Sequence, residues 1–377
     1  MPFYYQSHGK EPPNQFVATV RRIYNALGFH RGYNFPLWII CGLGALGFCA
    51  SRAMYLDYDN TYKEAKLPTG DWEYQSHGRG RVGMLLHLAA VIPIGFLLPW
   101  QFLPVIRYRF ILFHRINGYL LILLLFVCDA GAILVGPGAL GGAIETRLHI
   151  GILTISTVGS AVMAYINIKR LQIDQHRAWM LRCWAYAFNI ISLRLIQLAA
   201  LEIISRMKTF HAAMDCRRID GALSLVQPGL ATLFYPECEG NPDAFVAVLA
   251  DRYPEPTPQG IPRLDRIAAA YQVTFAMSGA MALLLHAFAV ECYLHLTQAE
   301  ANRLKRVSHE RQLQRGWRIP RDAGWLTRET WGDCDEFDYR EKTKKFRSRQ
   351  TTQDPNPTLG SRTLYPLFHL QKLDQHT

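Results

Sequence analysis

The sequence predicts an all-α fold, a polytopic membrane helix bundle of about six transmembrane helices with both termini in the cytosol. Half of the 377 residues are hydrophobic and only 19% are charged, whereas a soluble domain carries about a quarter of its residues as charges. Most of the charge is confined to residues 1–34, 57–80, 206–265 and 296–377. Because a charge at the centre of a membrane helix costs roughly 2.5–3.5 kcal/mol, the nearly charge-free segments between them are expected to lie in a bilayer.

Six apolar stretches are long enough to cross the hydrocarbon core, which takes about 20 helical residues. Helices are expected because a backbone exposed to lipid must satisfy its own hydrogen bonds. The first stretch follows a polar arm and predicts a retained signal anchor rather than a cleaved signal peptide. The stretches are about 35–55, 82–104, 110–135, 148–168, 179–204 and 267–293.

Lysine and arginine in the connections predict the orientation. The connection after the second stretch carries Arg107 and Arg109 without an acid, and the one after the fourth is also basic. Residues 57–80 and 206–265 instead carry more acids than bases. This alternation places the N-terminus and the tail inside and the 206–265 loop outside. It also assigns the net charge of +11 to the inner face of a membrane protein, so no nucleic-acid partner is expected.

The charge pattern also predicts the domain boundaries. Two cysteines of the long loop, Cys216 and Cys238, can form a disulfide if that loop faces an oxidising compartment. The expected parts are a cytosolic N-terminal arm (1–34), a five-helix membrane core (35–204) with a four-helix histidine-bearing bundle (82–204), an extracytosolic loop or cap (205–266), a sixth transmembrane helix (267–295) and a partly disordered cytosolic tail (296–377).

Four histidines alternate between the two faces of the predicted bundle. His87 lies inside the second stretch on the outer side, and His149 opens the fourth on the same side. His114 opens the third stretch on the inner side, and His176 immediately precedes the fifth. The sequence thus predicts an outer pair on the second and fourth helices and an inner pair on the third and fifth.

One imidazole from each of two helices at matching depth is what bis-histidine ligation of a b-type haem requires. Two such pairs predict two haems and a path for electrons from a cytosolic donor to the outer side. Neighbouring glycines would let a flat macrocycle approach the helices: Gly83, Gly95, Gly118, Gly151 and Gly159. Neighbouring arginines suit haem propionates: Arg81 and Arg147 beside the outer pair, and Arg115 and Arg177 beside the inner pair.

A second interpretation stays open. A histidine followed by arginine at a helix end is also ordinary membrane-interface chemistry, and His114 and His176 sit at that boundary. In this interpretation the protein is a non-enzymatic transporter, lipid-binding protein or scaffold whose His–Arg pairs meet lipid phosphate or another ligand. Non-haem metals are less favoured, because no carboxylate lies at the depth of the histidines.

Two buried charges are also candidates. Asp129 and Arg194 lie at similar depth on the third and fifth helices and could form a pair that is structural or marks a pathway. His286 of the last helix is expected to be a hydrogen-bonded structural histidine. A membrane-embedded enzyme acting on an apolar substrate remains a third hypothesis.

Three segments carry a family resemblance: GRGRVGMLLH (78–87), QFLPVIRYRFILFHRINGY (101–119) and NIKRLQIDQHRAWMLR (167–182). Through them, residues 71–196 resemble the domain-of-unknown-function family 2306 of multi-pass membrane proteins, in its fungal form. The resemblance implies a membrane protein whose recurring histidines are the four described above, and it implies no activity. The layout is also remotely similar to the ascorbate-dependent di-haem transmembrane cytochromes, in which histidines on four successive helices bind two haems. That similarity implies electron transfer.

Overall fold

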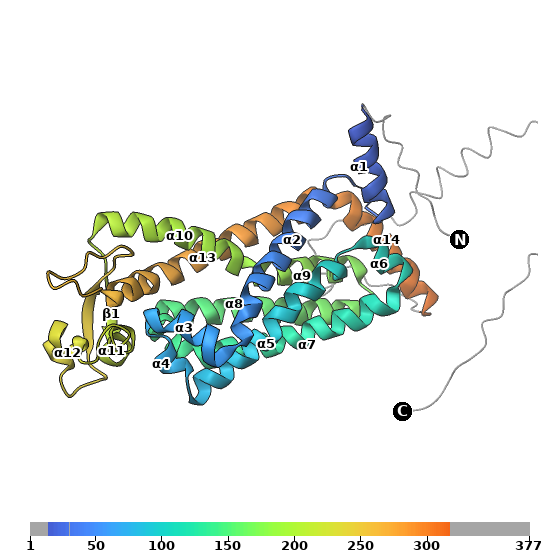
Figure 1. Ribbon diagram of the computed structural model, residues 1–377. Coiled ribbons are helices and arrows are strands. Elements are labelled where there is room, and N and C mark those ends of the chain that lie inside the picture. The colour runs from blue at the N-terminus through green and yellow to red at the C-terminus, as the bar shows by residue number, and fades with distance from the viewer. Residues whose placement is uncertain (1–13, 30, 317–377) are drawn as a thin grey trace, which may run out of the picture. The chain divides into compact units, whose positions relative to one another are not determined.

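The computed structural model describes residues 14–29 and 31–316. The chain forms two compact units, Met1–Ser308 and His309–Thr377, and the fold described here is that of the first. Six helical segments of the described residues are long and apolar enough to cross a membrane, as the sequence predicts (Figure 1). They are formed by α2 (Asn34–Ala53), α5 (Gly78–Gln101), α7 (Ile111–Val135), α8 (Ile144–Lys169), the consecutive helices α9 (Ile173–Ala187) and α10 (Asn189–Met207), and α13 (Leu264–Leu296).

Short elements connect these helices. The N-terminal arm contains an amphipathic helix, α1 (Gln15–Ala26), and the tail begins with α14 (Gln298–Gln314). The predicted disorder of the tail concerns residues 317–377, which lie outside the described part of the chain. The remaining connections are η1 (Met54–Leu56), η2 (Tyr58–Tyr62), α3 (Lys63–Lys66), η3 (Leu67–Thr69), α4 (Trp72–Gln75), α6 (Pro104–Arg109) and η4 (Gly136–Gly142).

Helices α5, α7, α8 and α9 share one hydrophobic core. Side chains from all four meet there, including Leu98, Leu125, Ala161 and Trp184. Helices α5 and α7 approach closely at a pair of glycines, where a Cβ on Gly131 would lie 2.5 Å from the Gly83 carbonyl oxygen. Such small residues allow backbones to pack tightly where lipid supplies no hydrophobic driving force. This four-helix core is the scaffold that carries all four predicted histidines.

The fifth span is interrupted, although it contains neither proline nor glycine. Helix α9 ends at Ala187, and α10 begins at Asn189. The last-turn carbonyls of a helix lack intrahelical partners, and His286 of α13 lies with Nδ1 2.7 Å from one of them, that of Ala185. After the interruption α10 packs along α13. The break therefore separates the helix that carries His176 from the one that carries Arg194.

Residues 208–263 form a small cap at one end of the unit. It contains strands β1 (His211–Asp215) and β2 (Phe245–Leu249), which pair antiparallel with His211 opposite Leu249, and α11 (Cys216–Leu223), α12 (Leu230–Phe234) and η5 (Pro236–Cys238). Alternate strand residues are buried, as expected for a sheet with one face on a core. Cys216 and Cys238 form a disulfide within this cap. The sequence leaves open whether this segment is a loop or a cap, and in the structure it contains two strands and three short helical elements.

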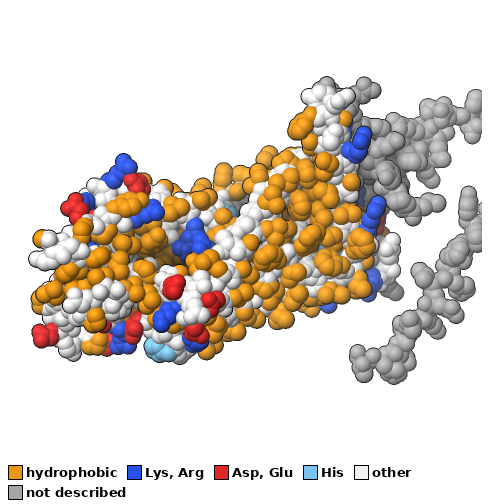
Figure 2. Space-filling model, in the orientation of Figure 1, with side chains coloured by type: hydrophobic (Ala, Val, Ile, Leu, Met, Phe, Trp, Pro, Cys, Tyr) orange, Lys and Arg blue, Asp and Glu red, His pale blue; other side chains and the backbone are white. Residues whose placement is uncertain are grey.

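Hydrophobic side chains cover the face of the helices that Figure 2 shows, and charged side chains gather over the cap and the connection before α5. Leu43, Leu123 and Leu285, for example, are exposed on three different spans. An apolar surface of this extent indicates contact with lipid. We call the end of the unit that carries the cap the cap side, and the opposite end the far side.

Candidate functional site

The four histidines lie on the four-helix core at two levels, as the sequence predicts. Helix α5 starts at Gly78 and α8 at Ile144, so both begin four residues earlier than expected. His87 and His149 therefore lie deeper on the cap side. Helix α9 starts at Ile173, so His176 lies inside the helix rather than before it. His114 and His176 each follow the start of their helix by three residues, on the far side.

Two of the histidines are oriented by backbone carbonyl groups. His87 Nδ1 lies 3.1 Å from the Cys128 carbonyl oxygen, and His176 Nδ1 lies 2.9 Å from that of Ala164. A carbonyl oxygen only accepts, so in each ring Nδ1 donates its hydrogen and neutral Nε2 keeps a lone pair. Histidines that bind a metal commonly make this same second contact, which fixes the ring and its tautomer.

The far-side pair has a further property of a ligand site. His114 and His176 belong to α7 and α9, two helices whose side chains meet in the shared four-helix core. The buried Nδ1 of His114 has no hydrogen-bond partner among the described residues. His114 Nδ1 is one of several such buried atoms in the described residues, and a bound ligand is one way to satisfy it. If haem were bound at this level, His114 and His176 are the residues that would hold it.

The contacts of the cap-side histidines run to different helices. His87 contacts α7 through Cys128, whereas the His149 ring lies edge-on to Phe275 of α13, with the ring centroids 6.0 Å apart. The same ring occupies the space beside Gly279, where a Cβ would be 2.5 Å from Nε2. His149 thus fits a haem at this level only after its ring leaves the surface of α13.

Residues 84–217 match the model of a family described as a predicted membrane protein (DUF2306). The match spans all four histidines and ends inside α11 of the cap. No curated protein and no solved structure matches the chain. The family match and the six apolar helices together identify an integral, multi-pass membrane protein.

The arginines expected to hold propionates differ in their availability. Arg81 forms a bidentate ion pair with Asp59, at 2.7 and 2.8 Å, and these bonds hold the pKa of Asp59 below its usual value. Arg177 donates to Thr297 Oγ1 at 3.1 Å. Arg147 makes a long contact of 3.4 Å to the Pro137 carbonyl, and Arg115 is exposed. The connection between α2 and α5, which carries Asp59, therefore occupies the guanidinium of Arg81.

The expected pairing of Asp129 with Arg194 is wrong. Asp129 accepts a hydrogen bond from Thr157 Oγ1 of α8 at 2.8 Å. Arg194 donates to Gln197 Oε1 at 2.9 Å and lies over the Phe275 ring. No ion pair joins the two charges in the described part of the chain. Matching depth fixes the level of a side chain but not the face of the helix from which it projects.

Three of the five glycines near the histidines serve helix packing instead of a macrocycle. A Cβ would meet Leu134 at Gly83, Cys49 at Gly95 and Gln101 at Gly118. Open space surrounds only Gly151 and Gly159 of this set. Both belong to α8, the helix that carries His149.

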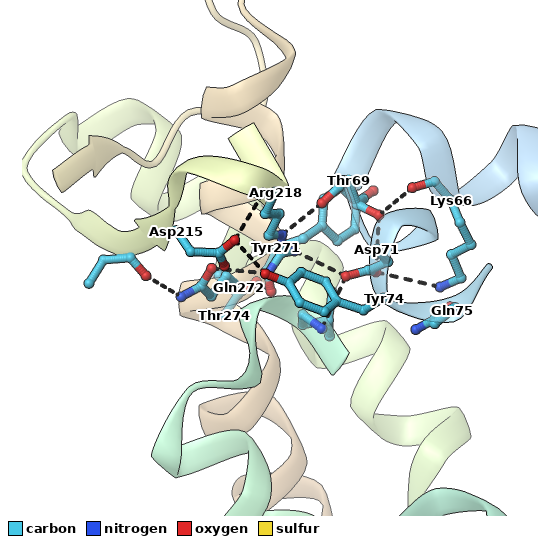
Figure 3. Close-up of polar contacts among 12 residues, drawn as sticks. Lys66, Thr69, Asp71, Tyr74, Gln75, Asp215, Arg218, Tyr271, Gln272 and Thr274 are labelled. Carbon is cyan, nitrogen blue, oxygen red and sulfur yellow. Dashed lines mark hydrogen bonds and ion pairs between the residues drawn. The ribbon is translucent and has the colours of Figure 1, made fainter. Parts of the chain in front are cut away.

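A buried polar network on the cap side was not anticipated from the sequence (Figure 3). Asp71 is 1% exposed and Arg218 is 0% exposed, and Arg218 Nη2 lies 3.2 Å from Asp71 Oδ1. Arg218 also donates from Nε to the Thr69 carbonyl at 2.8 Å and from Nη1 to Gln272 Oε1 at 3.1 Å. Asp71 accepts from the Leu140 backbone at 3.1 Å. The network thereby joins four parts of the chain: the connection between α2 and α5, η4, the cap and α13.

A second set of contacts reinforces this junction. Tyr74 donates a hydrogen bond to Asp215, and burial together with this bond raises the pKa of the Tyr74 hydroxyl. Asp215 also accepts from the Arg218 backbone at 2.9 Å and so caps α11. Gln272 donates to the Ala213 carbonyl at 2.8 Å. Charged residues in connections are ordinarily solvated, so only contacts between distant parts of the chain reveal this network.

Proposed function

We propose that the protein is a transmembrane electron carrier in which the histidine pairs hold haem b. The observation that carries the proposal is the far-side pair. His176 presents a lone pair at Nε2 because its Nδ1 donates to the Ala164 carbonyl, and the neighbouring His114 has a buried ring nitrogen that the described protein leaves unsatisfied. We assign the first haem to this pair and the second to His87 and His149.

The chain would hold and insulate the group. The hydrogen bonds from His87 and His176 to carbonyl groups fix each imidazole ring and raise its basicity as a ligand. The apolar core between the two histidine levels, which includes Leu121, Leu125 and Trp184, excludes water. When bound, haem supplies one-electron redox chemistry. Two such centres would carry electrons between the two sides of the membrane, from a cytosolic donor if the predicted orientation holds.

We propose that the two haem sites fill in a definite order. The far-side pair has one oriented ring and one unsatisfied ring nitrogen, whereas His149 must leave its packing against Gly279 and Phe275. We therefore expect the far-side site to fill first when haem is scarce. The remaining alternative is the transporter or lipid-binding interpretation, in which the same histidines hold no iron.

The test is an absorbance spectrum of the detergent-purified protein before and after dithionite, with haem counted per chain. We expect sharp reduced bands and about two haems per chain. His176→Ala should remove the far-side haem, and His295→Ala should remove none, because His295 lies exposed near the end of α13. A colourless protein from a haem-replete host would overturn the proposal and favour the transporter or lipid-binding alternative.

A further inference from the structure

Two arginines on neighbouring helices have no acidic partner among the described residues. Arg52, near the end of α2, donates to the Tyr55 hydroxyl at 3.0 Å and lies over the Phe48 and Tyr55 rings. Arg194 of α10 has a neutral amide as its acceptor, that of Gln197. Among the described residues neither guanidinium forms an ion pair. The helices that carry them, α2 and α10, lie in contact.

A lysine adds to this excess of positive charge. Lys66 Nζ lies over the Tyr62 ring, and that ring meets the Tyr55 ring edge-on with the centroids 5.6 Å apart, so the tyrosines connect Lys66 to Arg52. Lys66 Nζ is 3.9 Å from Asp71. Asp71, however, is already engaged by Arg218 and by the Leu140 backbone. In Figure 3 Arg218 and Lys66 reach Asp71 from opposite sides.

The charges in this region do not balance. Burial lowers the pKa of Lys66, and the neighbouring guanidinium groups of Arg194, Arg218 and Arg52 lower it further, while Asp71 alone opposes them. Among the described residues, Asp71 is the carboxylate that pairs with Lys66 and Arg218, and neither Arg52 nor Arg194 forms an ion pair. Burial of an uncompensated charge is costly, whereas the same groups become favourable partners once an anion lies between them.

The cluster lies near the expected depth of lipid head groups. Helix α13 has 33 residues, about 50 Å at 1.5 Å per residue, whereas the hydrocarbon core is about 30 Å thick. The exposed ion pair of Arg182 with Glu291 marks the far-side boundary, so the surplus length lies on the cap side. Phe275, against which Arg194 packs, follows the start of α13 by eleven residues, about 16 Å. Arg194 therefore lies near the cap-side boundary of the core.

We propose that Arg52, Lys66 and Arg194 form a binding site for one oxyanion, a phosphate or carboxylate group, at the cap-side membrane boundary. The side chains of all three are partly exposed, so the site is open to a ligand. Figure 2 shows Lys or Arg side chains at the edge of a hollow between α10–α13 and the connection after α2. The guanidinium forks suit bidentate contacts to a phosphate or carboxylate. The anion can be the head group of an anionic lipid or a free oxyanion.

Native mass spectrometry of the full-length protein tests the site. The protein is released from micelles under three conditions: with phosphatidic acid, with phosphatidylcholine, and with inorganic phosphate in the absence of either lipid. The ligands retained per chain are counted. We expect one phosphatidic acid to be retained per chain. The number of phosphatidylcholine molecules retained should be lower by about tenfold or more, because this head group carries no net charge to compensate the cations. Retention of inorganic phosphate in the absence of lipid would identify a free oxyanion as the ligand.

Matched variants separate this site from general attraction to lipid. Arg52→Gln and Arg194→Gln should each weaken retention by about tenfold, as expected for the loss of a charge-assisted bond. Arg206→Gln should leave it unchanged, because Arg206 lies exposed on the same helix as Arg194 and pairs with Glu202. Arg194→Lys preserves the charge and provides the comparison if a glutamine variant folds poorly. Equal retention by the Arg194 and Arg206 variants, or by the two lipids, would overturn the proposal. None of these readouts depends on haem.

Discussion

Single residues decide whether the cap stays attached to the membrane helices. Arg218 is fully buried, and Asp71 is the only carboxylate that pairs with its guanidinium in the described part of the chain. The other hydrogen bonds of the guanidinium are to the neutral groups of Thr69 and Gln272. A buried ion pair adds little net stability over an apolar pair of the same size, but the removal of one partner leaves a buried charge uncompensated.

We therefore expect Asp71→Asn to lower the free energy of unfolding by about 3–5 kcal/mol. Thermal unfolding in detergent measures the change. Asp243→Asn is the matched control, because Asp243 pairs with Arg217 on the exposed surface of the cap, where an ion pair contributes about 0–1 kcal/mol. Similar losses in the two variants would show that burial does not strengthen the dependence of Arg218 on Asp71.

At the scale of elements, the predicted and observed helices differ mainly at their ends. Hydropathy predicted the six spans, but it marks only the part of a helix that lies in lipid. The polar first turns of α8, with Glu145 and Arg147, and of α9, with Asp174 and Arg177, are helical as well. The histidine levels were predictable because they follow from span order. The partner of each histidine was not, because it depends on the face of the helix.

The break between α9 and α10 had no signal in the sequence, since proline and glycine are absent there. Its stabilising contact comes from His286, nearly a hundred residues later in the chain, which contacts both the Ala185 carbonyl and Ser192 Oγ at 2.7 Å. Both ring nitrogens are engaged, as expected of a structural histidine. The cap strands also escaped prediction, because neither HAAMD nor FVAVL alternates polar with apolar residues.

We expect His286→Leu to destabilise the protein by about 1–3 kcal/mol, because the Ala185 carbonyl would lose its donor inside the bundle. Haem content per chain should stay at the wild-type value, since the Nε2 lone pair of the ring is engaged by the Ser192 hydroxyl at 2.7 Å. Thermal unfolding and haem counting on the same sample measure both quantities. If the variant instead lost haem at unchanged stability, His286 would have to be a ligand.

The whole molecule is asymmetric about the membrane. The disulfide between Cys216 and Cys238 lies in the cap, and disulfides persist in oxidising compartments. The basic connections that predicted the orientation, including Arg107 and Arg109, lie at the far side. Covalent chemistry and charge distribution therefore favour the same orientation, with the cap outside the cytosol.

Glycosylation in a eukaryotic host tests this orientation. An Asn-Gly-Thr acceptor inserted after Gln259, in the exposed loop that precedes α13, should be glycosylated. The same acceptor inserted in the connection between α8 and α9, after Arg170, should not be. A shift in electrophoretic mobility that glycosidase reverses is the measurement. Modification at the α8–α9 connection alone would reverse the predicted orientation.

The glycine at position 279 has a consequence for how this protein can vary. The imidazole of His149 occupies the volume that a side chain at 279 would fill, with Nε2, Cε1 and Cδ2 all within 2.8 Å of the missing Cβ. A single methyl group there would displace the ring without any change to a histidine. Position 279 has no reactive group of its own, yet it controls whether the His149 ring can rest against α13. An evolutionary change from glycine to alanine there would displace this ring while leaving every candidate ligand in the sequence.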